Sequence, residues 1–174
     1  VYLNSNEHLR TSNSMETRED RFVKKFISDF PIHPTLRVAP IMHQIRSVKD
    51  SIEIEIMKKA SDITEKGFRR ILSFIKPEVM EYEIEAELMH EFLSNRSKGF
   101  AYTPIIASGK SACVLHYIEN NKSCKDGDII LMDFGAEYAN YASDLTRCVP
   151  VNGKFTYRQK EVYNSVLRVK NEAT

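Results

Sequence analysis

The chain has 174 residues, of which 42% are hydrophobic and 28% are charged, and its 25 basic residues are almost balanced by 24 acidic ones. This length allows one domain, or one domain with part of another, and the composition is typical of a globular protein. A net charge of +1 gives no overall field to attract nucleic acid or an anionic membrane, and no apolar run approaches the ~18–20 residues that span a bilayer.

The cysteines and the chain ends suggest a cellular compartment and an incomplete chain. Cys113, Cys124 and Cys148 are odd in number and follow no CxxC pattern. This disfavours a disulfide framework or a structural zinc site, and a reducing cytoplasm is the simpler compartment. Because the chain begins with valine and ends within a helical pattern, we expect it to be an excerpt of a longer protein.

The first fifty residues contain one predicted helix and one predicted boundary. Apolar residues at helical spacing predict a helix from Thr17 to Phe30. The next stretch, "FPIHPTLRVAP", carries three prolines and is therefore the best candidate for a linker or domain boundary.

Two amphipathic helices are predicted to follow. The first begins after Asp50, buries a stripe of residues from Ile52 to Ile75 at steps of three and four, and ends before Pro77. The second runs from about Glu81 to Asn95. Because both precede a series of strands, the pattern predicts an α/β fold in which helices cover one face of a sheet.

Strand patterns dominate from residue 99 onwards. Short apolar runs at Tyr102–Ala107 and Val114–Tyr117 predict two strands, the second of which carries His116. A longer apolar run ends at Phe134 and another begins at Tyr141, so we expect the two to form a hairpin.

This hairpin carries two carboxylates in an otherwise apolar setting. If it turns near Tyr138 and Ala139, Asp133 lies directly opposite Asp144, with Cβ atoms roughly 4.5–5.5 Å apart. Two carboxylates at that distance repel, so either one is protonated or a cation lies between them, and a divalent ion with oxygen ligands resolves the conflict most directly. A turn shifted by one residue is the alternative, with one or both aspartates solvated at strand ends.

Several stretches together resemble a known family. "FAYTPIIASG", "LHY", "DGDIILMDFGAEYANYASDLTR" and "PVNGKFTYRQKEVYNSVL" are similar to the first half of the catalytic domain of Xaa-Pro aminopeptidase (aminopeptidase P), a pita-bread metallopeptidase related to prolidase, methionine aminopeptidase and creatinase. The resemblance implies α/β (α+β) architecture, with a curved antiparallel sheet covered by helices. It assigns residues 40–174 to the N-terminal half of the catalytic domain. Residues 1–39, including "YLNSNEHLR" and "METREDRF", resemble the tail of the N-terminal domain and its linker.

The same resemblance implies a hydrolase that releases the N-terminal residue from Xaa-Pro peptides. Asp133 is similar to a ligand of one metal ion, Asp144 to the ligand that bridges two divalent ions, commonly Mn²⁺, and His116 to a catalytic, substrate-binding histidine. The family's other ligands, a histidine and two glutamates, would lie beyond residue 174. We therefore expect an inactive fragment, whose partners are proline-containing peptides, the missing half of the catalytic domain and further copies of the protein.

Three alternatives stay open. Prolidase would accept only dipeptides, and a non-enzymatic pita-bread module would bind peptides or proteins. The retention of mutually repelling carboxylates and His116 favours an enzyme. Nucleic-acid binding has only the weak support of basic clusters such as Arg21 to Lys25. One departure from the family pattern is Glu78, which follows Pro77 where a glycine is expected.

Overall fold

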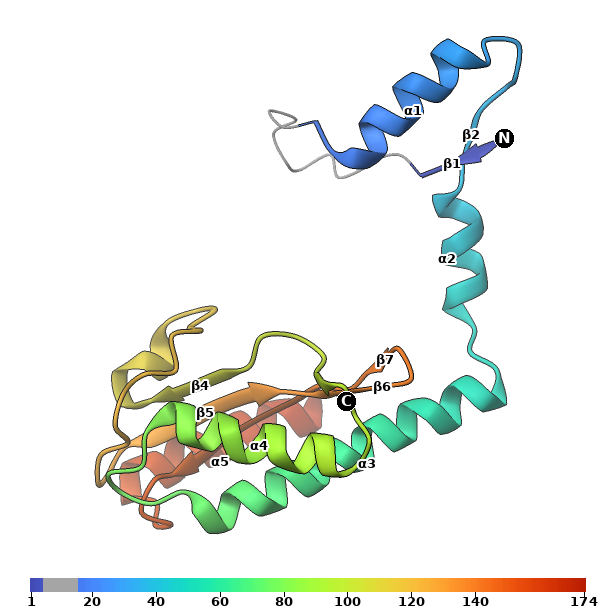
Figure 1. Cartoon of the computed structure of the whole chain (residues 1–174). Coiled ribbons are helices and arrows are strands. Elements are labelled where there is room, and N and C mark those ends of the chain that lie inside the picture. The colour runs from blue at the N-terminus through green and yellow to red at the C-terminus, as the bar shows by residue number, and fades with distance from the viewer. Residues whose placement is uncertain (5–15) are drawn as a thin grey trace. The chain divides into compact units, whose positions relative to one another are not determined.

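The chain forms two units, which Figure 1 shows as a ribbon coloured by residue number. The computed structural model describes residues 1–4 and 16–174, and it divides into Val1–Asp50 and Ser51–Thr174. Most of "YLNSNEHLR" lies outside the described residues. The domain boundary expected after residue 39 stays a prediction. Among the described residues, no helix is long and apolar enough to cross a membrane.

The described residues of the first unit form two short strands and two helices. β1 (Tyr2–Leu3) pairs in parallel with β2 (Leu36–Arg37). The predicted first helix is confirmed as α1 (Arg18–Asp29), which Thr17 caps together with Asp20 in a reciprocal capping box. α2 (Ala39–Ser47) ends shortly before the second unit.

Two helices cover one face of the sheet in the second unit. α3 (Ser51–Phe74) and α4 (Glu81–Ser94) pack against each other, and their close approach depends on Gly67. A Cβ atom at Gly67 would lie 2.7 Å from the Phe92 ring. The predicted stripe on α3 is buried from Ala60 to Ile71, but Ile52 in the first turn is 65% exposed.

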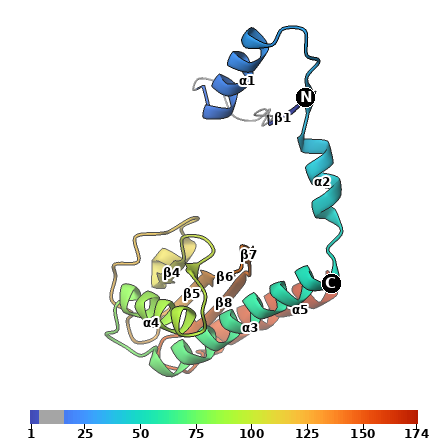
Figure 2. The same ribbon diagram turned by 45° about the vertical axis from the view of Figure 1, so that its right-hand side comes forward.

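The strands form two small antiparallel sheets that share one bent hairpin. One sheet has the order β4 (Ile105–Ser108), β5 (Ile129–Phe134), β8 (Leu145–Pro150), and the other has β3 (Gly99–Phe100), β6 (Ala136–Tyr138), β7 (Tyr141–Ala142). Only Gly135 separates β5 from β6, so the hairpin bends there from one sheet into the other. The predicted antiparallel, helix-covered sheet is thus confirmed, and Figure 2 shows it from a second direction.

The two faces of β5 have different neighbours. Ile130, Met132 and Phe134 are fully buried in the core with α3 and α4. Ile129, on the opposite face, lines a groove with Cys148 and the apolar residues of α5 (Tyr157–Glu172). Asp133 shares the face of Ile129 because side chains alternate along a strand.

The strand expected at Val114–Tyr117 was wrong. A 3₁₀ helix, η1 (Gly109–Cys113), precedes an irregular loop in which Val114 and His116 are exposed and Tyr117 is buried. His116 has a φ of +54°, in the left-handed region that no strand residue adopts. The run has the apolar composition of a strand, but Val114, Leu115 and His116 are all exposed and only Tyr117 is buried, so the side chains do not alternate.

The backbone conformation at Glu78 explains why a glycine is expected at this position. Its φ is +74°, a conformation that is strained for residues with a side chain. We therefore expect Glu78→Gly to raise the free energy of unfolding by up to about 1 kcal/mol, because strain relief exceeds the added chain entropy. Denaturant unfolding of both forms measures this. The matched control is Lys125→Gly at an exposed turn residue outside the positive-φ set, which should lower stability. A loss of stability in Glu78→Gly would contradict the explanation.

Candidate metal centre and substrate-binding residues

The register of the hairpin differs from the predicted one, yet it keeps the two aspartates on one face. Asp133 pairs with Thr146, and the turn is centred between Ala139 and Asn140, both at positive φ. The predicted direct opposition of Asp133 and Asp144 is therefore wrong. A turn shifted by one residue changes every cross-strand partner by two positions, so each side chain keeps its face.

The hydroxyl group of Tyr102 joins the two carboxylates. It lies 2.7 Å from Oδ1 of Asp133 and 2.9 Å from Oδ1 of Asp144. Burial, followed by hydrogen bonds to both aspartates, raises the pKa of Tyr102 well above its ordinary value, so the hydroxyl remains a donor at neutral pH. The two carboxylates thus converge on one point in space. Tyr102 was not among the predicted site residues, and its only signal was its place within "FAYTPIIASG".

The bend that brings Asp144 to this point is held by close backbone packing and by α3. A Cβ atom at Gly135 would lie 1.8 Å from the carbonyl oxygen of Ser143, so only glycine fits between the strands. Beside it, the amide of Ala136 donates to Thr64 Oγ1 at 2.8 Å and to Ser143 Oγ at 3.0 Å. Thr64 and Ser143 also share a hydrogen bond. A buried residue of α3 therefore fixes the position of the residue before Asp144.

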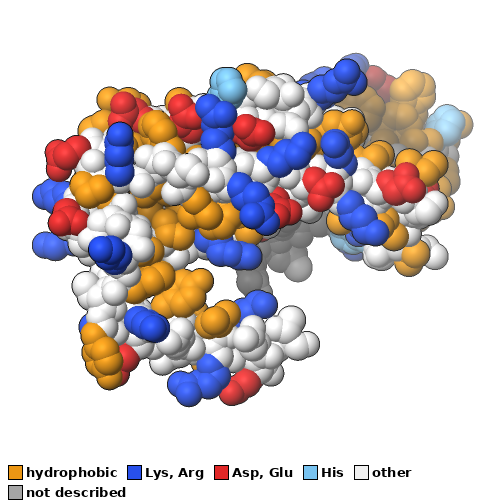
Figure 3. Space-filling view, turned by 90° about the horizontal axis from the view of Figure 1, so that it is seen from below, with side chains coloured by type: hydrophobic (Ala, Val, Ile, Leu, Met, Phe, Trp, Pro, Cys, Tyr) orange, Lys and Arg blue, Asp and Glu red, His pale blue; other side chains and the backbone are white. Residues whose placement is uncertain are grey.

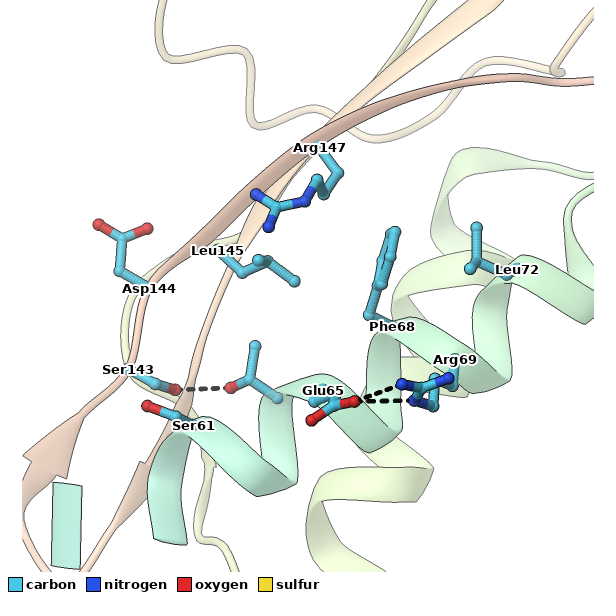
Figure 4. A pocket seen from close by; sticks show the side chains of 10 residues that line it. Ser61, Glu65, Phe68, Arg69, Leu72, Ser143, Asp144, Leu145 and Arg147 are labelled. Atoms are coloured by element: carbon cyan, nitrogen blue, oxygen red, sulfur yellow. Dashed lines mark hydrogen bonds and ion pairs between the residues drawn. The ribbon is translucent and has the colours of Figure 1, made fainter. Parts of the chain in front are cut away.

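A cavity of about 440 Å³ lies between α3 and the edge of β8. Figure 4 shows Phe68 and Leu145 on the inner side of this cavity, whereas the carboxylate of Asp144 points away from α3. Glu65 at the cavity is paired with Arg69 at 2.6 Å. Asp144 thus borders this cavity, which belongs to the helix side of the hairpin, but its carboxylate points to the other side.

The chemical type of the ligand atoms at this site suits a hard divalent cation. Asp133 and Asp144 offer carboxylate oxygens, the ligand type that Mg²⁺, Ca²⁺ and Mn²⁺ prefer. In the described part of the chain no group of three or more His, Cys, Asp or Glu residues could hold a metal ion. The described residues therefore supply two side chains, and a complete coordination shell needs more.

The comparison with known proteins places the chain in a family. Residues 55–174 match metallopeptidase family M24. The chain belongs to this family. Membership implies divalent metal ions and agrees with the resemblance seen in the sequence. An M24 metallopeptidase accounts for carboxylates that share one face of a curved sheet.

Several relatives of this M24 chain, and solved structures similar to it, are named as aminopeptidases. The Xaa-Pro aminopeptidase of Haemophilus influenzae is 41% identical over 134 residues, which cover 77% of this chain and 31% of that protein. Proline aminopeptidase P II from Yersinia pestis has a TM-score of 0.84 at 33% identity, covering 94% of this chain and 39% of its own. A substrate complex of Escherichia coli aminopeptidase P has a TM-score of 0.82 at 34% identity, with coverage of 91% and 38%. The chain spans about a third of the length of these relatives.

Proposed function

We propose that the chain is part of an Xaa-Pro aminopeptidase, which releases the N-terminal residue from peptides with proline in second position. The observation that carries this proposal is the convergence of Asp133 and Asp144 on the Tyr102 hydroxyl, on one face of an M24 fold. A scaffold protein gains nothing from keeping two carboxylates that repel each other. The similarity to Xaa-Pro aminopeptidases supports the choice of substrate.

Each site residue has a proposed role. Asp133 would bind one of two divalent ions, proposed to be Mn²⁺, and Asp144 would bridge both. When bound, the ions would supply Lewis-acid activation of water and of the peptide carbonyl. Tyr102 would orient both carboxylates by sharing its one hydroxyl proton between their oxygens.

His116 is proposed to contact the substrate near the scissile bond. Its side chain is exposed, as are those of Leu115 and Ile118 in the same loop. An imidazole in this setting can donate a hydrogen bond to a carbonyl oxygen or transfer a proton.

We propose that the remaining metal ligands come from a further part of the same protein. That part would also pack against an apolar groove on this chain. This groove lies between α5 and the face of β5 and β8 that carries Ile129, and it is lined by Val162, Val166 and Leu167. Figure 3, the view from below, shows hydrophobic side chains gathered at a hollow in the surface. An exposed apolar groove of this kind favours association. We therefore propose that the rest of the catalytic domain, or a second copy, covers it.

The test compares the intact protein with the 174-residue chain. Loaded with Mn²⁺, the intact protein should hydrolyse a tripeptide with proline in second position but not its alanine counterpart, and the 174-residue chain should hydrolyse neither. An Xaa-Pro dipeptide, assayed alongside, separates an aminopeptidase from a prolidase. Peptide binding without turnover by the intact protein would favour a binding module, and turnover by the 174-residue chain would contradict its proposed inactivity.

A further inference from the structure

Glu81 is a fully buried carboxylate that the proposed chemistry does not use. It is the first residue of α4 and has no exposed surface. Burying a carboxylate is costly unless its oxygens accept hydrogen bonds, so a residue of this kind needs a structural account.

Both oxygens of Glu81 are satisfied by donors from distant segments. Oε1 accepts from the amide of Ser108 at 2.8 Å and from its hydroxyl at 2.6 Å. Oε2 accepts from the Tyr117 hydroxyl at 2.7 Å and from the amide of Lys122 at 3.0 Å. The position at the start of α4 adds the favourable field of the helix N-terminus.

These contacts close around the loop that carries His116. Ser108 lies immediately before η1, and Tyr117 immediately follows His116. Asn120 forms a second anchor, because it accepts from the amide of Ile106 at 2.9 Å and donates to the carbonyl of Pro104 at 3.0 Å. The loop is therefore tied at both ends, while its middle projects into solvent.

The backbone of His116 shows why such ties matter. Its φ of +54° is unfavourable for a residue with a side chain, and such conformations persist where the surroundings hold them. Leu115, the preceding residue, is 91% exposed and contributes little to holding the loop. The hydrogen bond between Tyr117 and Glu81 is the nearest buried restraint on His116.

We propose that Glu81 is a positioning residue for His116, acting through Tyr117 to hold the exposed loop in one conformation. The proposal rests on the proposed role of His116 in substrate contact. It assigns to the start of α4 a part in activity, although Glu81 touches neither substrate nor metal. The alternative is that Glu81 contributes to folding alone.

Tyr117→Phe separates these two possibilities in the intact, metal-loaded protein. The substitution keeps the ring, which packs under Lys122 with its Nζ 5.4 Å from the ring centroid. It removes the bond to Glu81 and, with it, a long 3.5 Å hydrogen bond to Oδ1 of Asn121. Tyr141→Phe is the matched control, because it also removes a hydroxyl that donates to a glutamate, here Glu53, at 2.6 Å. Glu81→Gln should act in the same direction as Tyr117→Phe, since its amide would face two donors.

Two readouts are expected to change for Tyr117→Phe but not for the control Tyr141→Phe. Chymotrypsin cleavage at Leu115, mapped by mass spectrometry, should accelerate about tenfold or more, because loss of a bond to a charged group lets the loop open. Turnover of an Xaa-Pro tripeptide should lose about tenfold in kcat/KM. In a His116→Ala background the same substitution should change kcat/KM less than twofold, since its effect passes through His116.

The cleavage rates and the kinetics test separate parts of the proposal. Unchanged cleavage at Leu115 in Tyr117→Phe would overturn the anchoring, whatever the kinetics. Equal losses of kcat/KM with and without His116 would show a purely structural role and overturn the positioning. Wild-type kinetics in His116→Ala alone would contradict the proposed function of His116. The rate of chymotrypsin cleavage at Leu115 would still test whether Glu81 anchors the loop.

Discussion

Asp144→Asn is expected to lower Xaa-Pro hydrolysis by the intact protein by several orders of magnitude. The substitution removes one negative charge at nearly constant shape. If Asp144 bridges two ions, both lose a ligand charge, and the activation of water depends on intact coordination. Metal analysis alongside tripeptide turnover measures both effects. His116→Ala is the comparison, because it should slow turnover by ~10²–10⁴-fold while metal content stays near wild type.

The stability of Asp144→Asn should change in opposite directions without and with metal. Without metal, the substitution removes the repulsion from Asp133, and Tyr102 can donate to Asp133 alone, so the variant should melt no lower than wild type. With Mn²⁺ at about 100 times its dissociation constant, wild type should gain about 2.7 kcal/mol through linkage, and the variant should gain much less. Equal metal content and equal turnover in both proteins would contradict the proposed dinuclear site.

Gly135→Ala is expected to cause the largest loss of stability of any single methyl addition considered for this fold. The new Cβ would lie 1.8 Å from the carbonyl oxygen and 2.5 Å from the carbonyl carbon of Ser143. Both are backbone atoms, so no side-chain rotation relieves the overlap and the two strands must separate. We expect a loss of about 3 kcal/mol or more, at or above the upper end for overpacking. Because Asp144 follows Ser143, metal binding should weaken as well.

Gly127→Ala is the control for Gly135→Ala. Gly127 has a φ of +83°, but a Cβ atom there meets nothing within 4 Å. Alanine should therefore cost only the backbone strain of about 1–2 kcal/mol, with metal content unchanged. Urea unfolding of both variants, with metal analysis, makes the comparison. Similar losses in the two variants would show that the close approach at Gly135 is not what holds the hairpin bend.

Periodicity in the sequence predicted the helices, but not the register of the hairpin. The sequence predicted that Asp133 and Asp144 share one face of the sheet, but the continuous apolar run before Asp133 did not show which face that is. The predicted turn at Tyr138 and Ala139 was one residue too early, because the observed central pair is Ala139 and Asn140, both at positive φ. Asn140 was the better turn signal. The error preserved the shared face of the aspartates because it moved their partners by two residues.

Other features depended on contacts that no local pattern contains. Tyr102 becomes a site residue only because the segment between β3 and β4 passes over the hairpin bend. The segment around His116 has the apolar composition of a short strand, but hydrogen bonds from Tyr117 and Asn120 to distant segments fix it as a loop. The first turn of α3 is amphipathic, yet Ile52 has no partner that buries it within the described residues.

The outer edge of β8 has a consequence for how this chain finds its partners. In the described residues β8 pairs only with β5, so the backbone groups on its other side are open to a further strand. A strand from the same polypeptide would compete for this edge at an effective concentration in the millimolar range, whereas a strand from another molecule competes only at its actual concentration. At low protein concentration the sheet should therefore be completed by a strand of the same molecule. At high concentration of shortened chains, strands from other molecules should pair with this edge instead.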